Sequence, residues 1–133
     1  MNAPRAKIIR VLIEYFENDD RRIEHALKVL FQAEQIFQAN PDGDEEIVIA
    51  AALLHDIGIK VSEQELGYNT GKTQEKYGPD IAERLLASIG FPADKIAIVK
   101  NIIGNHHSPS RYDYPELQIL KDADKIVNQQ ENG

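Results

Sequence analysis

The chain has 133 residues, a formal net charge of −7 and no cysteine. This length is sufficient for one domain with its own hydrophobic core. The lack of cysteine excludes disulfides, thiolate metal sites and cysteine nucleophiles, which leaves His, Asp and Glu as possible metal ligands. Lys and Arg residues are scattered rather than gathered into a basic stripe, so we expect no nucleic-acid partner.

The N-terminal apolar run resembles a signal peptide only briefly. It begins at Ile8, and the charged residues Arg10 and Glu14 interrupt it. No other segment is long and apolar enough to cross a bilayer. We therefore expect a cytoplasmic protein that does not associate with a membrane and whose partner is a small molecule, while the oligomeric state stays open.

Helical start and stop signals recur along the chain, and no stretch alternates apolar and polar residues as a half-buried strand does. We therefore predict an all-α fold, a bundle of about six helices. The first helix is expected at residues 4–17. Asp19 or Asp20 caps a second helix that continues to about Asn40.

The third expected helix is the central one. Asp44 caps its N-terminus, and Glu45 and Glu46 favour the positive end of its dipole. Residues 47–54 are apolar on every side, which is typical of a helix surrounded by protein. Gly58 ends the helix, so the polar residues just before it are expected to lie next to the core.

The second half of the chain is expected to contain three more helices. A polar loop extends to about Gly71, and a fourth helix then has Pro79 among its early residues and stops at Gly90. A fifth covers residues 93–106, and Pro115 opens the sixth. Because no repeat, low-complexity tract or long linker interrupts the sequence, we expect one domain across the whole chain.

The dipeptide His55-Asp56 is expected to finish the apolar helix, so its carboxylate needs a partner. Burial of a carboxylate without a partner costs several kcal/mol or more. A hydrogen-bonded His–Asp pair in the core, or an Asp that caps a neighbouring helix, explains this dipeptide, taken alone, about as well as a metal site does. The other histidines and acidic residues decide between the two interpretations.

Helical spacing indicates which acidic residue of the last helix points inward. Asp124 shares a stripe with Leu120 and Val127. Asp122 lies beside Gln118 and is the better candidate for a supporting position behind the ligands. We therefore expect Asp124 to contribute to the site directly.

The same test separates the remaining histidines. His106 continues the stripe of Val99 and Ile102 and is expected to point inward. His107 is expected to be more exposed, or to hold the orientation of His106 from outside. His25 precedes a stripe that faces protein, and alone it would be read as an ordinary core histidine. All four histidines of the chain lie next to helical apolar stretches. A shared metal site is therefore the more economical interpretation.

The chain resembles the HD-domain superfamily of metal-dependent phosphohydrolases in three places. The first is His25. The second is the segment Ala-Leu-Leu-His-Asp-Ile-Gly, which contains His55 and Asp56, and the third is the segment Asp-Ala-Asp-Lys-Ile, which contains Asp124. The resemblance extends over about residues 22–128. It implies a helical bundle in which His25, His55, Asp56 and Asp124 bind one divalent cation.

Two further segments resemble a branch of small HD proteins, and they also set limits on the activity. The segments are Gln-Glu-x-x-Gly-Pro at residues 74–79 and Ile-Ile-x-x-His-His-Ser-Pro at residues 102–109. Gly78 stands about where branches with two metals have another histidine. His106, His107 and Glu75 could still supply part of a second metal site. The Gly-Tyr-Pro signature of cyclic-dinucleotide phosphodiesterases is absent after the histidine pair, so that activity is not expected.

We expect metal-dependent hydrolysis of a small phosphate ester, such as a nucleotide. Two imidazoles and two carboxylates leave coordination positions for water and for a substrate oxygen. Asp56 or Glu75 would orient that water, and Lys60, Arg22 and His106 are candidates to offset the phosphate charge. Nitrogen and oxygen ligands of this kind suit Mn, Fe, Ni, Co, Zn or Mg.

Two alternatives belong to other functional classes. One is a module that binds a metal or a nucleotide without turnover and acts as a sensor. The other is a diiron oxygenase on the same helical scaffold, which the absence of a histidine at Gly78 disfavours. Turnover distinguishes hydrolase from sensor, whereas iron stoichiometry and oxygen uptake identify an oxygenase.

Overall fold

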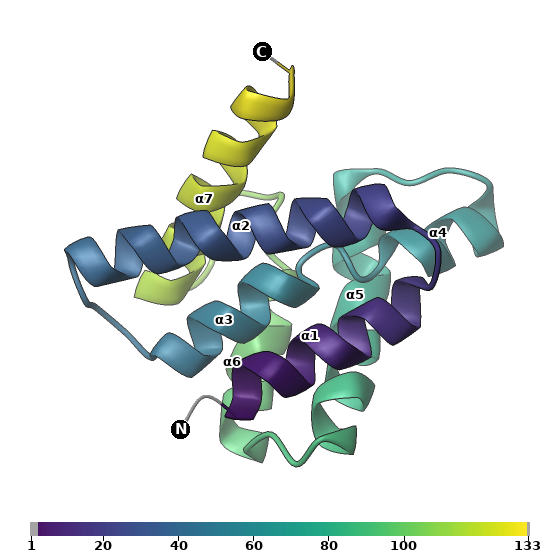
Figure 1. Cartoon of the computed structure of the whole chain (residues 1–133). Helices are drawn as coiled ribbons and strands as arrows, with labels where there is room; N and C mark the ends of the chain where they lie inside the picture. The colour runs from purple at the N-terminus through teal and green to yellow at the C-terminus, as the bar shows by residue number, and fades with distance from the viewer. Residues whose placement is uncertain (1–2, 133) are drawn as a thin grey trace.

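The computed structural model describes residues 3–132, and every regular element in this range is an α-helix. The elements in chain order are α1 (Ala3–Phe16), α2 (Asp20–Ala39), α3 (Glu45–Leu54), α4 (Ile59–Leu66), α5 (Gly71–Ser88), α6 (Ala93–Ile103) and α7 (Pro115–Asn132). The predicted all-α class is therefore confirmed (Figure 1). No helix in the described range is long and apolar enough to traverse a lipid bilayer.

Helix α3 lies at the centre of the bundle, as its composition predicts. Each residue from Ile47 to Leu54 is buried, and α1, α2, α6 and α7 all pack against this helix. The carboxylate of Asp44 caps α3, because its Oδ1 accepts hydrogen bonds from the backbone N–H groups of Glu46 and Ile47. The helix ends at Leu54, which leaves His55 and Asp56 in the turn at the centre of the molecule.

Helices α2 and α7 pack against each other and cross (Figure 1). The N-terminal half of α2 thereby lies beside the C-terminal half of α7, and both lie beside the turn that follows α3. This crossing brings His25 of α2 next to Asp124 of α7. The site is thus built where two helices that are far apart in the sequence meet.

Helix α4 occupies part of the segment that we expected to be a polar loop. It begins at Ile59, directly after Gly58, and ends at Leu66, where the following Gly67 caps it with a φ of 80° in the left-handed region. Ile59 and Ser62 are buried, and the helix packs against α5. Tertiary packing therefore stabilises a short helix that its polar composition does not signal.

Helix α5 starts where the polar loop was expected to end, but Pro79 is not one of its early residues. The helix begins at Gly71, and Pro79 lies in its interior. A capping box fixes the start: Thr70 Oγ1 accepts from the backbone N–H of Thr73, and Thr73 Oγ1 accepts from that of Thr70. The expectation for Pro79 was wrong because this cap, rather than the proline, determines the first turn.

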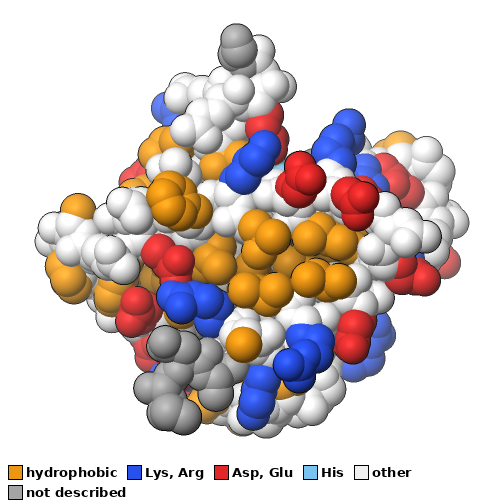
Figure 2. Space-filling model, viewed as in Figure 1, with side chains coloured by type: hydrophobic (Ala, Val, Ile, Leu, Met, Phe, Trp, Pro, Cys, Tyr) orange, Lys and Arg blue, Asp and Glu red, His pale blue; other side chains and the backbone are white. Residues whose placement is uncertain are grey.

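One face of the molecule is strongly apolar. Figure 2 shows hydrophobic side chains gathered over α1 and α2 and bordered by charged groups. Among the large hydrophobic side chains of α1 and α2, Ile13, Leu27 and Phe31 are exposed. None of them lines either of the two pockets that flank the candidate metal centre described below.

Candidate metal centre

Two histidines and two aspartates from three parts of the chain converge at one point. His25 comes from α2, His55 and Asp56 come from the turn after α3, and Asp124 comes from α7. Nε2 of His25 lies 3.1 Å from Asp124 Oδ1 and 3.5 Å from Asp56 Oδ2. Nε2 of His55 lies 3.3 Å from Asp56 Oδ2 and 3.4 Å from Asp124 Oδ1. All four side chains therefore direct potential donor atoms to a shared centre.

The centre is nearly closed to solvent. The side chain of His55 is fully buried, and those of His25, Asp56 and Asp124 are 13%, 18% and 16% exposed. Two carboxylates in so little water need positive charge nearby. Three of the four side chains nevertheless keep some exposed surface, which a ligand can reach.

The ring orientations of two histidines are fixed by backbone carbonyl groups. Nδ1 of His55 donates to the carbonyl oxygen of Ala52 at 2.8 Å, and Nδ1 of His106 donates to that of Ile103 at 2.7 Å. The acceptors belong to the last turns of α3 and α6, where helical carbonyl groups have no partner further along the helix. Both Nε2 atoms are then free of protons in the neutral ring and point into the site.

The Nε2 atoms of His55 and His106 test whether a metal suits this site. Both are buried and have no hydrogen-bond partner among the described residues. Buried polar atoms of this kind nearly always have a partner, and a neutral imidazole nitrogen is the commonest metal ligand. His55 groups with His25 and Asp56, and His106 groups with His107 and Asp56, as nitrogen and oxygen donors close enough together to hold a divalent cation.

The charges of the centre reinforce one another. Burial tends to lower the pKa of His55, but the charge of Asp56 and the nearby Asp124 outweigh it, and its pKa lies well above the ordinary value. Burial opposes ionisation of Asp56 as well, yet His55 and His106 hold the pKa of this carboxyl well below its usual range. The pKa of Asp124 is also lowered, because His25 and His55 overcome the effect of its burial.

His106 and His107 occupy different environments at the end of α6. His106 is buried, and its Nε2 lies 3.9 Å from Asp56 Oδ1. His107 is more exposed, and its Nε2 donates to Gln74 Oε1 at 2.6 Å. Burial and the neighbouring His106 lower the pKa of His107, so its ring tends to be neutral. Asp56, His106 and His107 also lie close enough to form a second, partial set of metal donors.

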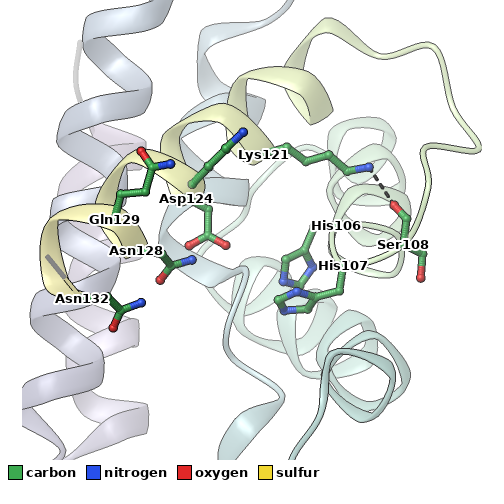
Figure 3. Close-up of a pocket in the computed structure, with 9 residues that line it drawn as sticks. His106, His107, Ser108, Lys121, Asp124, Asn128, Gln129 and Asn132 are labelled. Atoms are coloured by element: carbon green, nitrogen blue, oxygen red, sulfur yellow. Dashed lines mark hydrogen bonds between the residues drawn. The ribbon is translucent and has the colours of Figure 1, made fainter.

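Two pockets flank the centre, each with a volume of about 660 Å³. The first, drawn in Figure 3, is lined by His106, His107, Ser108, Lys121, Asp124, Lys125, Asn128, Gln129 and Asn132. The second is lined by Arg21, Arg22, His25, Lys28, Asp56, Ile59, Asn69, Asn128, Glu131 and Asn132. Asn128 and Asn132 of α7 belong to both pockets, so the two share one wall.

Basic residues are concentrated around these pockets although the chain as a whole is acidic. Arg21, Arg22 and Lys28 line one pocket, and Lys121 and Lys125 line the other. The ammonium group of Lys121 also donates to the carbonyl oxygen of Ser108 and thereby holds the loop after α6. A small anion that approaches the centre from either side meets positive charge.

Lys60 and Arg22 are held by other protein groups. The ammonium group of Lys60 donates to the backbone carbonyl of Tyr15 at 2.9 Å and to the carboxylate of Glu17 at 3.0 Å. It lines neither pocket at the centre. Arg22 does line one of them, but its guanidinium forms a two-pronged ion pair with Glu63 at 3.1 and 3.0 Å. The expected phosphate contact from Lys60 does not agree with this placement, because α4 directs it toward α1.

Glu75 and Asp122 also lie outside the donor cluster. Glu75 accepts hydrogen bonds from the backbone N–H of His107 and from the hydroxyl of Ser108. Its carboxylate therefore ties α5 to the loop after α6. Asp122 is exposed and accepts a hydrogen bond from Gln118 on the same helix. Neither placement fits the expected roles of orienting a catalytic water or supporting a ligand.

Sequence reasoning did not identify Glu131, which contacts the centre directly. Its Oε1 accepts a hydrogen bond from Nδ1 of His25 at 3.0 Å. The available signal is spacing, since Glu131 follows Asp124 by seven residues and lies on the same face of α7. Asn128 lies between them on that face and lines both pockets.

The close approach of α5 explains why a glycine stands at position 78. A Cβ atom at Gly78 would lie 2.8 Å from Cγ2 of Ile103, and one at Gly58 would lie 2.8 Å from the backbone nitrogen of Gly78. A Cβ atom at position 78 would therefore require the buried side chain of Ile103 to shift.

Comparisons with known proteins agree with this arrangement. A model of the HD domain family matches residues 22–129. An uncharacterized protein of Acanthamoeba polyphaga mimivirus is 30% identical over 109 residues, which cover 80% of this chain and 45% of that protein. An uncharacterized protein of Clostridium beijerinckii is 27% identical over 116 residues, which cover 84% of this chain and 69% of that protein.

A solved structure shares the fold. It is a predicted HD superfamily hydrolase from an uncultured Thermotogales bacterium, with a TM-score of 0.70 and 30% sequence identity. The match covers 91% of this chain and 66% of that one, so the chain spans less than two thirds of this relative and 45% of the mimivirus protein. The resemblance seen in the sequence is confirmed, and the chain belongs to the HD domain family.

Proposed function

We propose that this chain is a metal-dependent hydrolase of a small phosphate ester and that His25, His55, Asp56 and Asp124 hold the divalent cation. The observation that carries the proposal is the fully buried Nε2 of His55, which has no hydrogen-bond partner and faces two carboxylates. A hydrogen-bonded core pair would leave no such atom. Membership of the HD domain family and the hydrolase description of the Thermotogales relative support the same reading.

A bound divalent cation supplies Lewis acidity and a water of lowered pKa. Asp56 is the group of this chain best placed to orient that water. Its two oxygens face different histidines, Oδ2 toward His25 and His55 and Oδ1 toward His106. Because its pKa is held well below the usual range by those histidines despite burial, Asp56 is ionised at neutral pH and can accept a hydrogen bond. Glu75 is less suitable, since both of its oxygens already accept hydrogen bonds.

The substrate phosphate would bind through the basic residues at the pocket mouths. Arg21 and Lys28 lie on the exposed side of α2, one turn on either side of His25. Lys125 lies one residue beyond Asp124 at the other pocket. These cations replace Lys60 in our proposal, because Lys60 is held by α1. The polar amides of Asn69 and Asn128 can donate hydrogen bonds to other parts of the substrate.

The test is phosphate release from a panel of nucleotides, sugar phosphates and simple phosphate esters, with Mn, Mg, Co, Ni, Fe and Zn supplied in turn. We expect activity in wild type and its loss in His55→Ala and Asp56→Ala. Asp122→Ala, an exposed acid of α7, serves as the matched control and should retain activity. If wild type binds metal and a nucleotide but releases no more phosphate than the variants, the hydrolase proposal fails in favour of a non-catalytic binding module.

A further inference from the structure

Each histidine ligand needs its other ring nitrogen fixed by a hydrogen bond, because that bond determines which nitrogen is available to a metal. His55 and His106 use backbone carbonyls three residues earlier, at Ala52 and Ile103. These carbonyls are available because α3 and α6 end there. The end of a helix therefore sets the tautomer of both rings.

His25 has no free backbone carbonyl of this kind to accept a hydrogen bond from its ring. It lies within α2, which continues for fourteen residues beyond it to Ala39, so the carbonyls of the preceding turn bond along the helix. Its Nδ1 instead donates to Oε1 of Glu131, at 3.0 Å. Nε2 of the same ring faces Asp124 Oδ1, at 3.1 Å. The imidazole of His25 is thus held between two carboxylates of α7.

The two carboxylates reach His25 because of their spacing on α7. Seven residues separate Asp124 from Glu131, which is two turns, so both lie on the face that packs against α2. The second oxygen of Glu131 lies 3.7 Å from the ammonium group of Lys28, one turn after His25. Lys28 thereby contacts one oxygen of Glu131 while the other oxygen accepts the hydrogen bond from His25.

We propose that Glu131 is a positioning residue of the metal centre, which keeps His25 in the Nδ1-protonated tautomer and directs its Nε2 to the cation. The inference rests on the proposed metal site and adds to it an acidic residue outside the four-residue HD pattern. Carboxylates in this role orient the ring and raise the basicity of the ligand nitrogen. Their removal typically weakens metal binding by roughly 10- to 100-fold.

A purely structural role for Glu131 predicts a different effect of its removal. If it only joined α7 to α2, its removal would lower the stability of the fold and leave the metal affinity of the folded protein unchanged. Other contacts also hold the helices together, because α2 and α7 pack against each other and each contributes buried apolar residues to the core, Val29 and Val127 among them. Metal affinity and the tautomer of His25 therefore distinguish positioning from support of the fold.

The experiment measures Zn²⁺ and Mn²⁺ affinity by competition with a chromophoric chelator in wild type, Glu131→Ala, Glu131→Gln and Asp122→Asn. We expect Glu131→Ala to lose roughly 10- to 100-fold in affinity. Glu131→Gln should lose less, because its amide oxygen can still accept the Nδ1 proton. Asp122→Asn removes the same charge from an exposed site on α7 and should match wild type. Circular dichroism confirms that each variant is folded at the assay temperature.

Long-range ¹H–¹⁵N NMR of the histidine rings gives the second readout, with His25 assigned from a His25→Gln sample. Wild type with Zn²⁺ should show His25 protonated at Nδ1, and Glu131→Ala should show loss or exchange broadening of that proton. Unchanged affinity and an unchanged His25 pattern in Glu131→Ala would overturn this inference while the proposed metal site stands. A wild type that binds neither metal would overturn the site and the inference together.

Discussion

Nε2 of His25 lies 3.1 Å from Oδ1 of Asp124, although 99 positions separate the two residues in the sequence. The contact exists only where α2 crosses α7, so the centre cannot form until these helices have packed. Metal binding is therefore expected to be coupled to folding, because the unfolded chain lacks the assembled donors.

Asp124→Ala should reduce Mn²⁺ affinity by more than about 100-fold, since it removes a ligand rather than a supporting group. Isothermal titration calorimetry on the two aspartate variants of α7 measures this. Asp122→Ala is the matched control, because Asp122 is exposed and bonds only to Gln118 among the described side chains. Equal losses in both variants, or the opposite ranking, would show that the wrong aspartate has been assigned to the metal.

The stability of the metal-free protein should fall as pH rises above neutrality. The pKa of His25 and that of His55 are raised from 6.5, because their carboxylate neighbours outweigh the effect of burial. A raised histidine pKa contributes stability below the unfolded value of 6.5, and this contribution disappears as pH rises through the folded value. Urea unfolding in EDTA from pH 6 to 8.5 should show the decline, and His55→Gln should flatten it.

The same protein should lose stability at acid pH for the opposite reason. The pKa values of Asp56 and Asp124 are lowered from 3.8, since the histidines outweigh the burial of these carboxyls. Their contribution to stability is present above pH 3.8 and is lost as pH falls through the lowered pKa values.

Saturating Zn²⁺ should reverse the decline in stability at alkaline pH, because metal ligation needs deprotonated imidazoles. An alkaline decline that persists unchanged with Zn²⁺ would argue against competition between proton and metal.

Gly58→Ala should destabilise the fold by about 1 to 3 kcal/mol through overpacking. The added Cβ would lie 2.8 Å from the carbonyl oxygen of Gln74 and from the backbone nitrogen of Gly78, which are backbone atoms of α5. Gly67→Ala is a useful comparison, since nothing lies within 4 Å and only its φ of 80° is strained. Urea unfolding should rank Gly58→Ala as the more costly change, and the reverse order would contradict the close approach of α5.

Arg21→Gln and Lys125→Gln should each raise KM for a phosphorylated substrate about 3- to 10-fold with little change in kcat, as expected for groups that bind substrate and transition state alike. Both residues line the pockets beside the centre. Added salt should shrink the difference from wild type because it screens exposed charges. Lys7→Gln, an exposed change on α1, controls for net charge. No shift in KM would exclude these cations from phosphate binding.

The sequence by itself determined the fold class and much of the centre. An apolar segment such as residues 47–54 can be stable in water only when it is surrounded by protein, so its central place followed from composition. Helical spacing separated Asp124 from Asp122, because a stripe of apolar residues faces the core wherever that helix packs. The start of α3 could also be predicted from the sequence, because Asp44 caps the helix by accepting a hydrogen bond from the nearby backbone N–H of Glu46.

Only the tertiary structure decided which polar groups reach the centre and which bind elsewhere. Lys60 contacts Tyr15 and Glu131 contacts His25, across 45 and 106 positions, and no local pattern encodes either pairing. Helix α4 likewise depends on packing against α5 rather than on its own polar composition. Long side chains reach several partners from one backbone position, so their contacts are fixed by the crossing of distant helices.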